Sequence, residues 1–201
     1  AFAMNEEKAV FVAYTQDNRL IKTTLVAEDD FSYDPAYEAV YQEIELAFNR
    51  VDDILVTPDL AMAFVRSADQ VLVYDLRDED EVELKATIIP QLAQNRSKPN
   101  HLTAMALLSG GSSVLLADNA GKVSQWFEVA TDNGREFKQI RSFNVSAKEA
   151  ISKIVTEQYR KSFYTIGDNG SLGNFYTTSE ATLLNEPLFT ETFGPMAISP
   201  R

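Results

Sequence analysis

Apolar and polar residues alternate along four stretches of the chain, and in each stretch a polar turn separates two runs rich in β-branched and aromatic residues. A period of two places alternate side chains on opposite faces of a strand, so each stretch predicts an antiparallel hairpin. The four stretches read FVAYTQDNRLIKTTL, AFVRSADQVLVYDL, SVLLADNAGKVSQWFEV and SFYTIGDNGSLGNFYTT.

The hairpins recur at a nearly constant interval. The first apolar residue after each turn serves as a marker, and successive markers lie 51, 52 and 49 residues apart. The markers are Leu20, Val71, Val123 and Leu172. A period near 50 residues is typical of β-propellers with four strands per blade, and solenoids are the competing architecture. We therefore predict one all-β, β-propeller-like domain over residues 1–201, with repeats at approximately 1–50, 51–101, 102–150 and 151–201.

A further short apolar run precedes each later hairpin and predicts the inner strand of its repeat. These runs lie at residues 54–59, 105–110 and 153–158, and a last copy ends the chain at residues 196–201. No such run precedes the first hairpin, so the first repeat is expected to lack its own inner strand. The last copy then either completes that repeat and closes a small ring, or the chain is a portion of a larger propeller.

Three other segments bear on the outer strands. Residues 136–143 follow Asp132-Asn133-Gly134, a strong hairpin signal, and predict an outer strand. Residues 35–49 space their apolar positions in a way that fits a helix and a strand equally well. Residues 146–149 read Ser-Ala-Lys-Glu, a capping box that predicts one or two helical turns.

Composition and charge remove several classes of function. Lys and Arg number 18 against 30 Asp and Glu, and the resulting net charge of −12 has the wrong sign for gripping nucleic acid. The chain has no cysteine and a single histidine, His101, which excludes thiolate metal sites, cysteine nucleophiles and a histidine cluster for zinc. We expect no metal, no cofactor and no catalytic residue, and we interpret His101 as a surface loop residue.

An acidic run and two glycine-containing turns could suggest a chemical function, but a structural role fits each of them better. The acidic run at Asp75, Asp78, Glu79, Asp80, Glu81 and Glu83 does not have the spacing of a calcium-binding loop, and it fits a solvated strand edge better. Residues 167–170, Gly-Asp-Asn-Gly, and residues 118–121, Asp-Asn-Ala-Gly, lack the following helix that a phosphate-binding loop needs. Both are interpreted as tight hairpin turns.

Four residues are candidates for contacts with a partner. Trp126 is the only tryptophan, and it is either an exposed anchor or an aromatic packed between blades, which the repeat favours. Tyr159, Arg160 and Lys161 together form a small basic spot in an acidic chain.

The repeat resembles a degenerate WD40-type blade. Residues 150–155, followed by the 167–170 turn and Phe175-Tyr176, carry this likeness, although the Trp-Asp pair is eroded. Of the four positions equivalent to the Trp of the Trp-Asp pair, only Tyr74 is followed by Asp, namely Asp75. The four positions are Thr23, Tyr74, Trp126 and Phe175.

A more specific likeness covers residues 114–201. The segments VSQWFEV, FKQIRSF, RKSFYTIGDNGSLGNFYTTSEATLL and MAISPR resemble the large insertion domain of some bacterial phosphate ABC transporter permease subunits. The resemblance implies a soluble, non-enzymatic domain on the periplasmic side of the inner membrane, within a membrane-embedded protein. It also implies partners among the other transporter subunits and the periplasmic binding protein. A general WD40-like scaffold is the alternative, and a propeller hydrolase with paired carboxylates is a third hypothesis.

Overall fold

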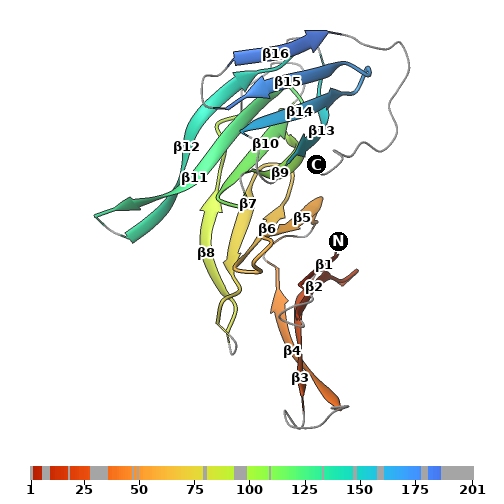
Figure 1. Cartoon of the computed structure of the whole chain (residues 1–201), viewed down its shortest axis with the longest axis vertical. Coiled ribbons are helices and arrows are strands. Elements are labelled where there is room, and N and C mark those ends of the chain that lie inside the picture. The colour runs from red at the N-terminus through yellow and green to blue at the C-terminus, as the bar shows by residue number, and fades with distance from the viewer. Residues whose placement is uncertain are drawn as a thin grey trace. The chain divides into compact units, whose positions relative to one another are not determined.

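The computed structural model describes residues 2–5, 10–17, 19–27, 36–46, 48, 50–78, 81–92, 99–108, 110–132, 134–146, 149–157, 161–177 and 181–186. Within these ranges the chain forms sixteen β-strands and no helix (Figure 1). The strands make four antiparallel sheets of four strands each, and the strand order in every sheet follows the chain. This is the all-β, β-propeller-like architecture that the repeat predicts.

The four sheets fall one in each predicted repeat. The first contains β1(Phe2–Asn5), β2(Val10–Tyr14), β3(Arg19–Ala27) and β4(Tyr37–Glu45). The second contains β5(Asp53–Val56), β6(Met62–Arg66), β7(Val71–Asp75) and β8(Glu83–Ile88). The third contains β9(Leu102–Leu108), β10(Ser113–Asp118), β11(Lys122–Thr131) and β12(Gly134–Asn144). The fourth contains β13(Ile151–Thr156), β14(Ser162–Gly167), β15(Leu172–Tyr176) and β16(Ala181–Glu186).

Two expectations about irregular segments are corrected. The first repeat does have its own first strand, because β1 pairs antiparallel with β2, with Phe2 opposite Ala13. The described residues of the capping-box segment, Ser146 and Glu149, are not helical; the intervening positions lie outside the described residues. The predicted inner-strand copy at residues 196–201 also lies outside them. Residues 37–45 form an outer strand, which decides the ambiguity of that segment.

The chain divides into two compact units. One comprises residues 1–67 and 72–85, and the other comprises residues 68–71 and 86–201. The first unit therefore holds the first sheet and most of the second, and the other holds the third and fourth sheets.

The core of the first unit is mainly aliphatic. The members of this cluster alternate along β2, β6 and β7, because successive side chains of a strand point to opposite faces; in β6 and β7 the residues between them are buried as well. Leu20, Val65 and Ala63 have no exposed surface, and Leu72 and Tyr74 pack into the same cluster. Burial raises the pKa of the Tyr74 phenol, because the phenolate would lose its hydration.

Three phenylalanines organise the core of the second unit. The rings of Phe163 and Phe175 stack with centroids 5.4 Å apart, and Phe143 meets Phe163 edge-on at 5.1 Å. They come from β12, β14 and β15, so the cluster joins the third and fourth sheets. A hydrogen bond of 2.6 Å from Thr156 Oγ1 to the Leu107 carbonyl joins the same two sheets between β13 and β9. Stacked and edge-on aromatic pairs add stabilisation beyond the area that they bury.

The turn between β10 and β11 requires a glycine. Gly121 has a φ of +77°, in the left-handed region that favours glycine. A Cβ at this position would overlap the Ser146 carbonyl and lie 2.8 Å from the Glu149 carbonyl oxygen. The space is occupied because Val145 N and Ser146 N both donate hydrogen bonds to the Gly121 carbonyl, at 2.9 and 3.0 Å. The link between β12 and β13 is thereby fixed onto this turn.

Candidate interaction surface

Two of the hairpins continue beyond the strands that support them, and Figure 1 shows both as long two-stranded ribbons. In the first sheet, the pairing of β2 with β3 ends at Thr24, whereas β3 and β4 remain paired as far as Ala27 and Tyr37. In the third sheet, β10 pairs with β11 as far as Phe127, whereas β11 and β12 remain paired as far as Thr131 and Gly134. Among the described residues, no third strand lies beside the outer segment of either ribbon.

The β3–β4 ribbon carries exposed apolar side chains on both faces. Opposite residues in an antiparallel pair share a face, and successive residues alternate. Tyr37 and Tyr41 therefore lie on one face, 59% and 66% exposed, and Val26 and Val40 lie on the other, 48% and 45% exposed. Large exposed side chains on both faces show that packing against the chain's own core does not account for these residues.

Charge distinguishes the outer strands of the two ribbons. The β4 strand contains Glu38, Glu43 and Glu45 and no basic residue. Glu43 accepts a hydrogen bond of 2.5 Å from Arg19 of β3. The β12 strand has the opposite balance, with Arg135, Lys138 and Arg141 against one glutamate.

The β11–β12 ribbon also differs in regularity. Its register shifts between Gln125 and Trp126, whereas all nine pairs of β3 with β4 are in a single register. A bulge of this kind twists a strand and interrupts the regular spacing of its free backbone groups. Phe127 and Ile140 are the exposed large apolar residues of this ribbon, at 38% and 47%.

Trp126 stands at that register shift. Its side chain is half-buried, and its indole Nε1 donates a hydrogen bond of 2.9 Å to Ser124 Oγ. The indole polar group is therefore satisfied within its own strand, and part of the ring faces solvent. A role of Trp126 as an anchor for a partner stays a prediction.

The predicted basic spot is only partly described. Tyr159 and Arg160 lie outside the described residues, and Lys161 is exposed just before β14. The backbone carbonyl of Lys161 accepts two hydrogen bonds of 2.7 Å, from the backbone N and the Oγ1 of Thr177. These bonds fix the backbone of Lys161 and leave its ammonium group to the surface.

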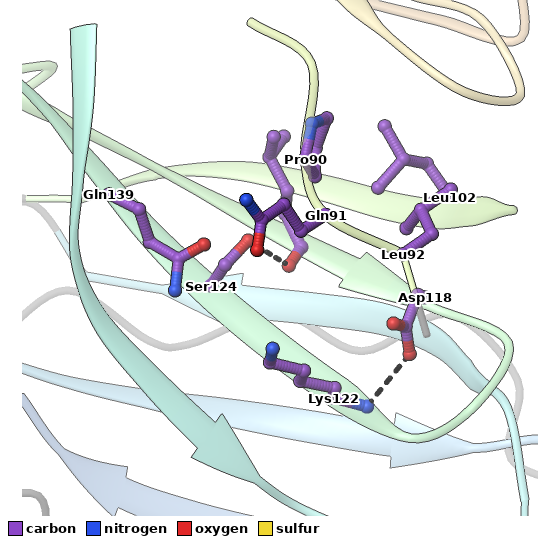
Figure 2. Close-up of a pocket in the computed structure, with 9 residues that line it drawn as sticks. Pro90, Gln91, Leu92, Leu102, Asp118, Lys122, Ser124 and Gln139 are labelled. Carbon is purple, nitrogen blue, oxygen red and sulfur yellow. Dashed lines mark hydrogen bonds between the residues drawn. The ribbon is translucent and has the colours of Figure 1, made fainter. Parts of the chain in front are cut away.

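A small pocket lies between the segment that follows β8 and the third sheet (Figure 2). Its apolar wall includes Pro90, Leu92 and Leu102, and its polar side includes Asp118 and Ser124. The Asp118 carboxylate is buried but accepts hydrogen bonds from the backbone N of Ala120 (3.0 Å) and of Lys122 (2.9 Å). The Ser124 hydroxyl donates to the Leu116 carbonyl and accepts from Trp126. The carboxylate and hydroxyl hold the hairpin together, so they do not form a free acid–base pair.

Neighbouring basic groups form ion pairs with part of the acidic run. Arg77 donates to both carboxylate oxygens of Asp75, and Lys85 Nζ lies 3.8 Å from the same carboxylate. The hydrogen bond from Arg77 is the main cause that lowers the pKa of Asp75 to about 2. Asp78 Oδ1 accepts from the Glu81 backbone N at 3.2 Å. Glu79 and Asp80 lie outside the described residues. The described members thus support the prediction of a solvated strand edge rather than a cation site.

Two buried basic residues were not singled out in the sequence. Lys22 is 5% exposed, and its Nζ donates a hydrogen bond of 2.6 Å to the Asp78 carbonyl. Arg66 is also buried, with its Nη1 3.8 Å from Asp52 Oδ2. Burial lowers the pKa of the Arg66 guanidinium and raises that of the nearby Asp53 carboxyl. Both cations lie in the first unit, where they link loops and strands rather than face a cavity.

The remaining predicted motifs are turns. His101 is exposed, and its backbone N donates a hydrogen bond of 3.0 Å to Asn119 Oδ1. In the turn at residues 167–170, Glu149 accepts from the Asn169 backbone N at 2.9 Å and from the Ser171 hydroxyl. A carboxylate therefore occupies the place where a phosphate-binding loop would receive an anion, which agrees with the hairpin interpretation.

The described residues show neither a metal-binding cluster nor a membrane-spanning helix. In the part of the chain that the structure describes, no three His, Cys, Asp or Glu side chains gather closely enough to hold a metal ion. No helix within the described ranges has the length and apolar character needed to cross a bilayer.

Comparison with known proteins shows the fold. No protein-family profile matches the chain, and no curated protein matches its sequence. Among solved structures, Sqt1 from Chaetomium thermophilum is similar with a TM-score of 0.65 at 15% identity. The alignment covers 92% of this chain and 45% of that chain, so this chain spans less than half the length of Sqt1. The likeness is to a WD40 propeller protein, and the chain has a β-propeller-like, WD40-like fold.

Proposed function

We propose that this chain is the extracytoplasmic, non-catalytic domain of a bacterial phosphate ABC transporter permease, and that it docks or regulates other parts of the transporter. The observation that carries the proposal is the sequence likeness of residues 114–201 to the insertion domain of such permeases. These residues include β11 to β15, which contain the second unit's aromatic cluster and the β11–β12 ribbon. The partners are other transporter subunits and the periplasmic phosphate-binding protein.

The described surface is better suited to binding a protein than to catalysis. The buried carboxylate of Asp118 is committed to backbone hydrogen bonds, and the exposed glutamates of β4 lie on a strand at the end of its sheet. Two ribbons extend past their sheets and present apolar and charged side chains together. Such loops and edges on a rigid β scaffold are common sites of protein recognition.

The test replaces residues 1–201 in the full-length permease with a flexible Gly/Ser linker and measures phosphate uptake, docking of the binding protein and the cellular response to phosphate. We expect at least one of the three to change while the membrane part still assembles with its partner subunits. Assembly is checked by co-purification of the other subunits, which serves as the control for folding of the membrane helices. Unchanged uptake, docking and phosphate response in the assembled variant would contradict the proposal.

A general WD40-like scaffold unrelated to transport is the second candidate. The WD40-like fold favours it, because that fold serves many unrelated interactions. The reading frame around this chain separates the two candidates. Flanking segments that encode membrane helices support the permease, and a frame without them supports the scaffold.

A further inference from the structure

The outer edge of β4 is regular and lies at the end of its sheet. Among the described residues, β4 forms a strand ladder with β3 alone, through nine residue pairs in one register. A strand in this position presents a row of backbone N–H and C=O groups, which another extended chain can pair with. Bulges commonly blunt such edges, and the register of β12 and of β16 with its neighbour does shift. The register of β4 does not.

The side chains of β4 add an apolar contribution. Tyr41 and Tyr37 stand on one face of the ribbon, and Val40 stands on the other beside Val26 of β3. Side chains of an added strand would alternate between the same two faces, next to these residues. Tyrosines are favoured at binding surfaces because each buries a large ring and keeps a polar tip.

The charge of β4 indicates the chemistry of its partner. Three exposed glutamates and no basic residue stand on the strand, whereas β3 offers one exposed arginine, Arg19, which bonds to Glu43 and lies opposite Glu45. An added strand with acidic residues would place like charges opposite each other, which destabilises a strand pair. An added strand with Lys or Arg would pair with Glu38 and Glu45 and would also approach the tyrosine faces.

We propose that β4 binds an extended segment rich in Lys or Arg from a partner protein, by addition of a fifth strand to the first sheet. The proposal rests on the role of this chain as an interaction domain, but not on its assignment to a phosphate permease. A second copy of the chain is the other basic candidate, because β12 carries Arg135, Lys138 and Arg141. The register shift of β12 makes its edge a poor match for the regular edge of β4.

The experiment uses two synthetic peptides of the same length as β4. In one, lysine alternates with valine or threonine, and in the other, glutamate replaces each lysine. Binding to the chain is measured by fluorescence anisotropy at low and high salt, and the site is located by amide chemical-shift changes. We expect saturable binding of the lysine peptide only, weakened by salt, with the largest shifts in β4.

A pair of matched variants tests the site. Glu38, Glu43 and Glu45 are changed together to glutamine in one variant, and the exposed Glu81, Glu83 and Glu136 in the other. Both variants lose the same net charge. We expect the β4 variant to bind the lysine peptide about 10-fold or more weakly and the control variant to change by less than about 2-fold, because nearby charges at an interface dominate over distant ones.

Three results would overturn the proposal. Equal weakening in both variants would mean that net charge alone attracts the peptide. Shifts of the unmodified protein outside β3 and β4 would place binding elsewhere. Failure of the lysine peptide to bind, together with salt-sensitive dimers abolished by Lys138→Glu and Arg141→Glu, would assign the edge to a second copy. Peptide binding is measured without the transporter, so its failure leaves the uptake test of the proposed function independent.

Discussion

The β3–β4 and β11–β12 ribbons occupy equivalent positions in their sheets, but their outer strands carry opposite charge. Both are hairpins between the last two strands of a sheet, and both extend past the preceding strand. The outer strand of one is acidic and evenly paired, and the outer strand of the other is basic and bulged. The repeat therefore determines the scaffold, whereas the side chains and register of the outer strand determine what each edge can bind.

The two units differ in their cores as well. The first unit buries aliphatic side chains such as Leu20 and Val65, and the second unit buries the Phe143, Phe163 and Phe175 cluster. A strongly aromatic core concentrates stabilisation in a few side chains.

The largest effect is expected from Phe163→Ala. Phe163 has no exposed surface and contacts both other rings, so its truncation should lower the free energy of unfolding by about 3–5 kcal/mol, measured by urea denaturation. Hydrogen exchange should accelerate mostly in β13 to β15. The matched change Leu20→Ala should accelerate exchange mostly in β2 and β3. Equal acceleration throughout the chain in both variants would show that the two cores behave as one.

The next effect compares two glycines with similar backbone angles. Gly121 and Gly110 have φ values of +77° and +69°, but only a Cβ at Gly121 would meet neighbouring carbonyls. Gly110→Ala should cost about 1 kcal/mol for the left-handed backbone, and Gly121→Ala about 2–4 kcal/mol because of the added clash. Equal urea midpoints for the two variants would refute the tight junction between the β10–β11 turn and residues 145–149.

The third effect is on the pH dependence of the first unit. The pKa of Asp75 in the folded chain is about 2, below its ordinary value of 3.8, so its ionised form adds stability that is lost as the pH falls from about 4 towards 2. The contribution of Asp53 to stability has the opposite pH dependence. Burial raises the pKa of its carboxyl, so ionisation of this group costs stability as the pH rises above 3.8.

Thermal melts across this pH range test both predicted pH dependences. Asp75→Asn should lose about 1 kcal/mol at neutral pH, a modest value for a partly exposed pair, and should melt with a shallower decline in acid. Asp53→Asn should remove the loss of stability above about pH 4. Identical pH profiles for Asp75→Asn and the unmodified chain would contradict the role of the Arg77 hydrogen bond.

The smallest effect compares one ion pair from each ribbon. Arg19 and Glu43 are both about half exposed, whereas Arg135 pairs with Glu128, whose side chain is only 12% exposed. Arg19→Ala should leave the free energy of unfolding nearly unchanged, because water screens this pair, and Arg135→Ala should lower it by up to about 1 kcal/mol. A larger loss for Arg19→Ala in chemical denaturation would reverse this ranking.

The hairpins could be predicted because alternation and turn residues act locally. Leu20, Val71 and Val123 are fully buried near the start of their strands, as the marker pattern requires. The β1 strand was missed because its four residues, FAMN, are too few to show a period and no turn signal follows them. For residues 37–45, the spacing fitted helix and strand alike, and pairing with β3 decides the structure.

The candidate surface was harder to predict. The charges of β4 and β12 can be read from the sequence, but nothing local shows that Tyr41 stays exposed while Leu20 is buried. That difference depends on the order of the strands, a tertiary fact, because Leu20 lies on β3 between two paired strands and Tyr41 lies on β4 at the end of the sheet. The burial of Lys22 is also tertiary, because its partner is a backbone carbonyl at Asp78, far along the chain. The sequence marks Trp126 as a single tryptophan, but it does not show the hydrogen bond from its indole to Ser124.

We propose that this domain docks other parts of a transporter through its ribbons. A photo-crosslinking residue placed at Tyr41, at Phe127 or at the exposed Ile89 of the full-length protein tests this role directly, in cells that express the complete transporter. We expect an adduct with a transporter subunit or with the phosphate-binding protein from a ribbon position, and none from Ile89. The absence of adducts from both ribbon positions, or adducts from Ile89 alone, would contradict this proposal.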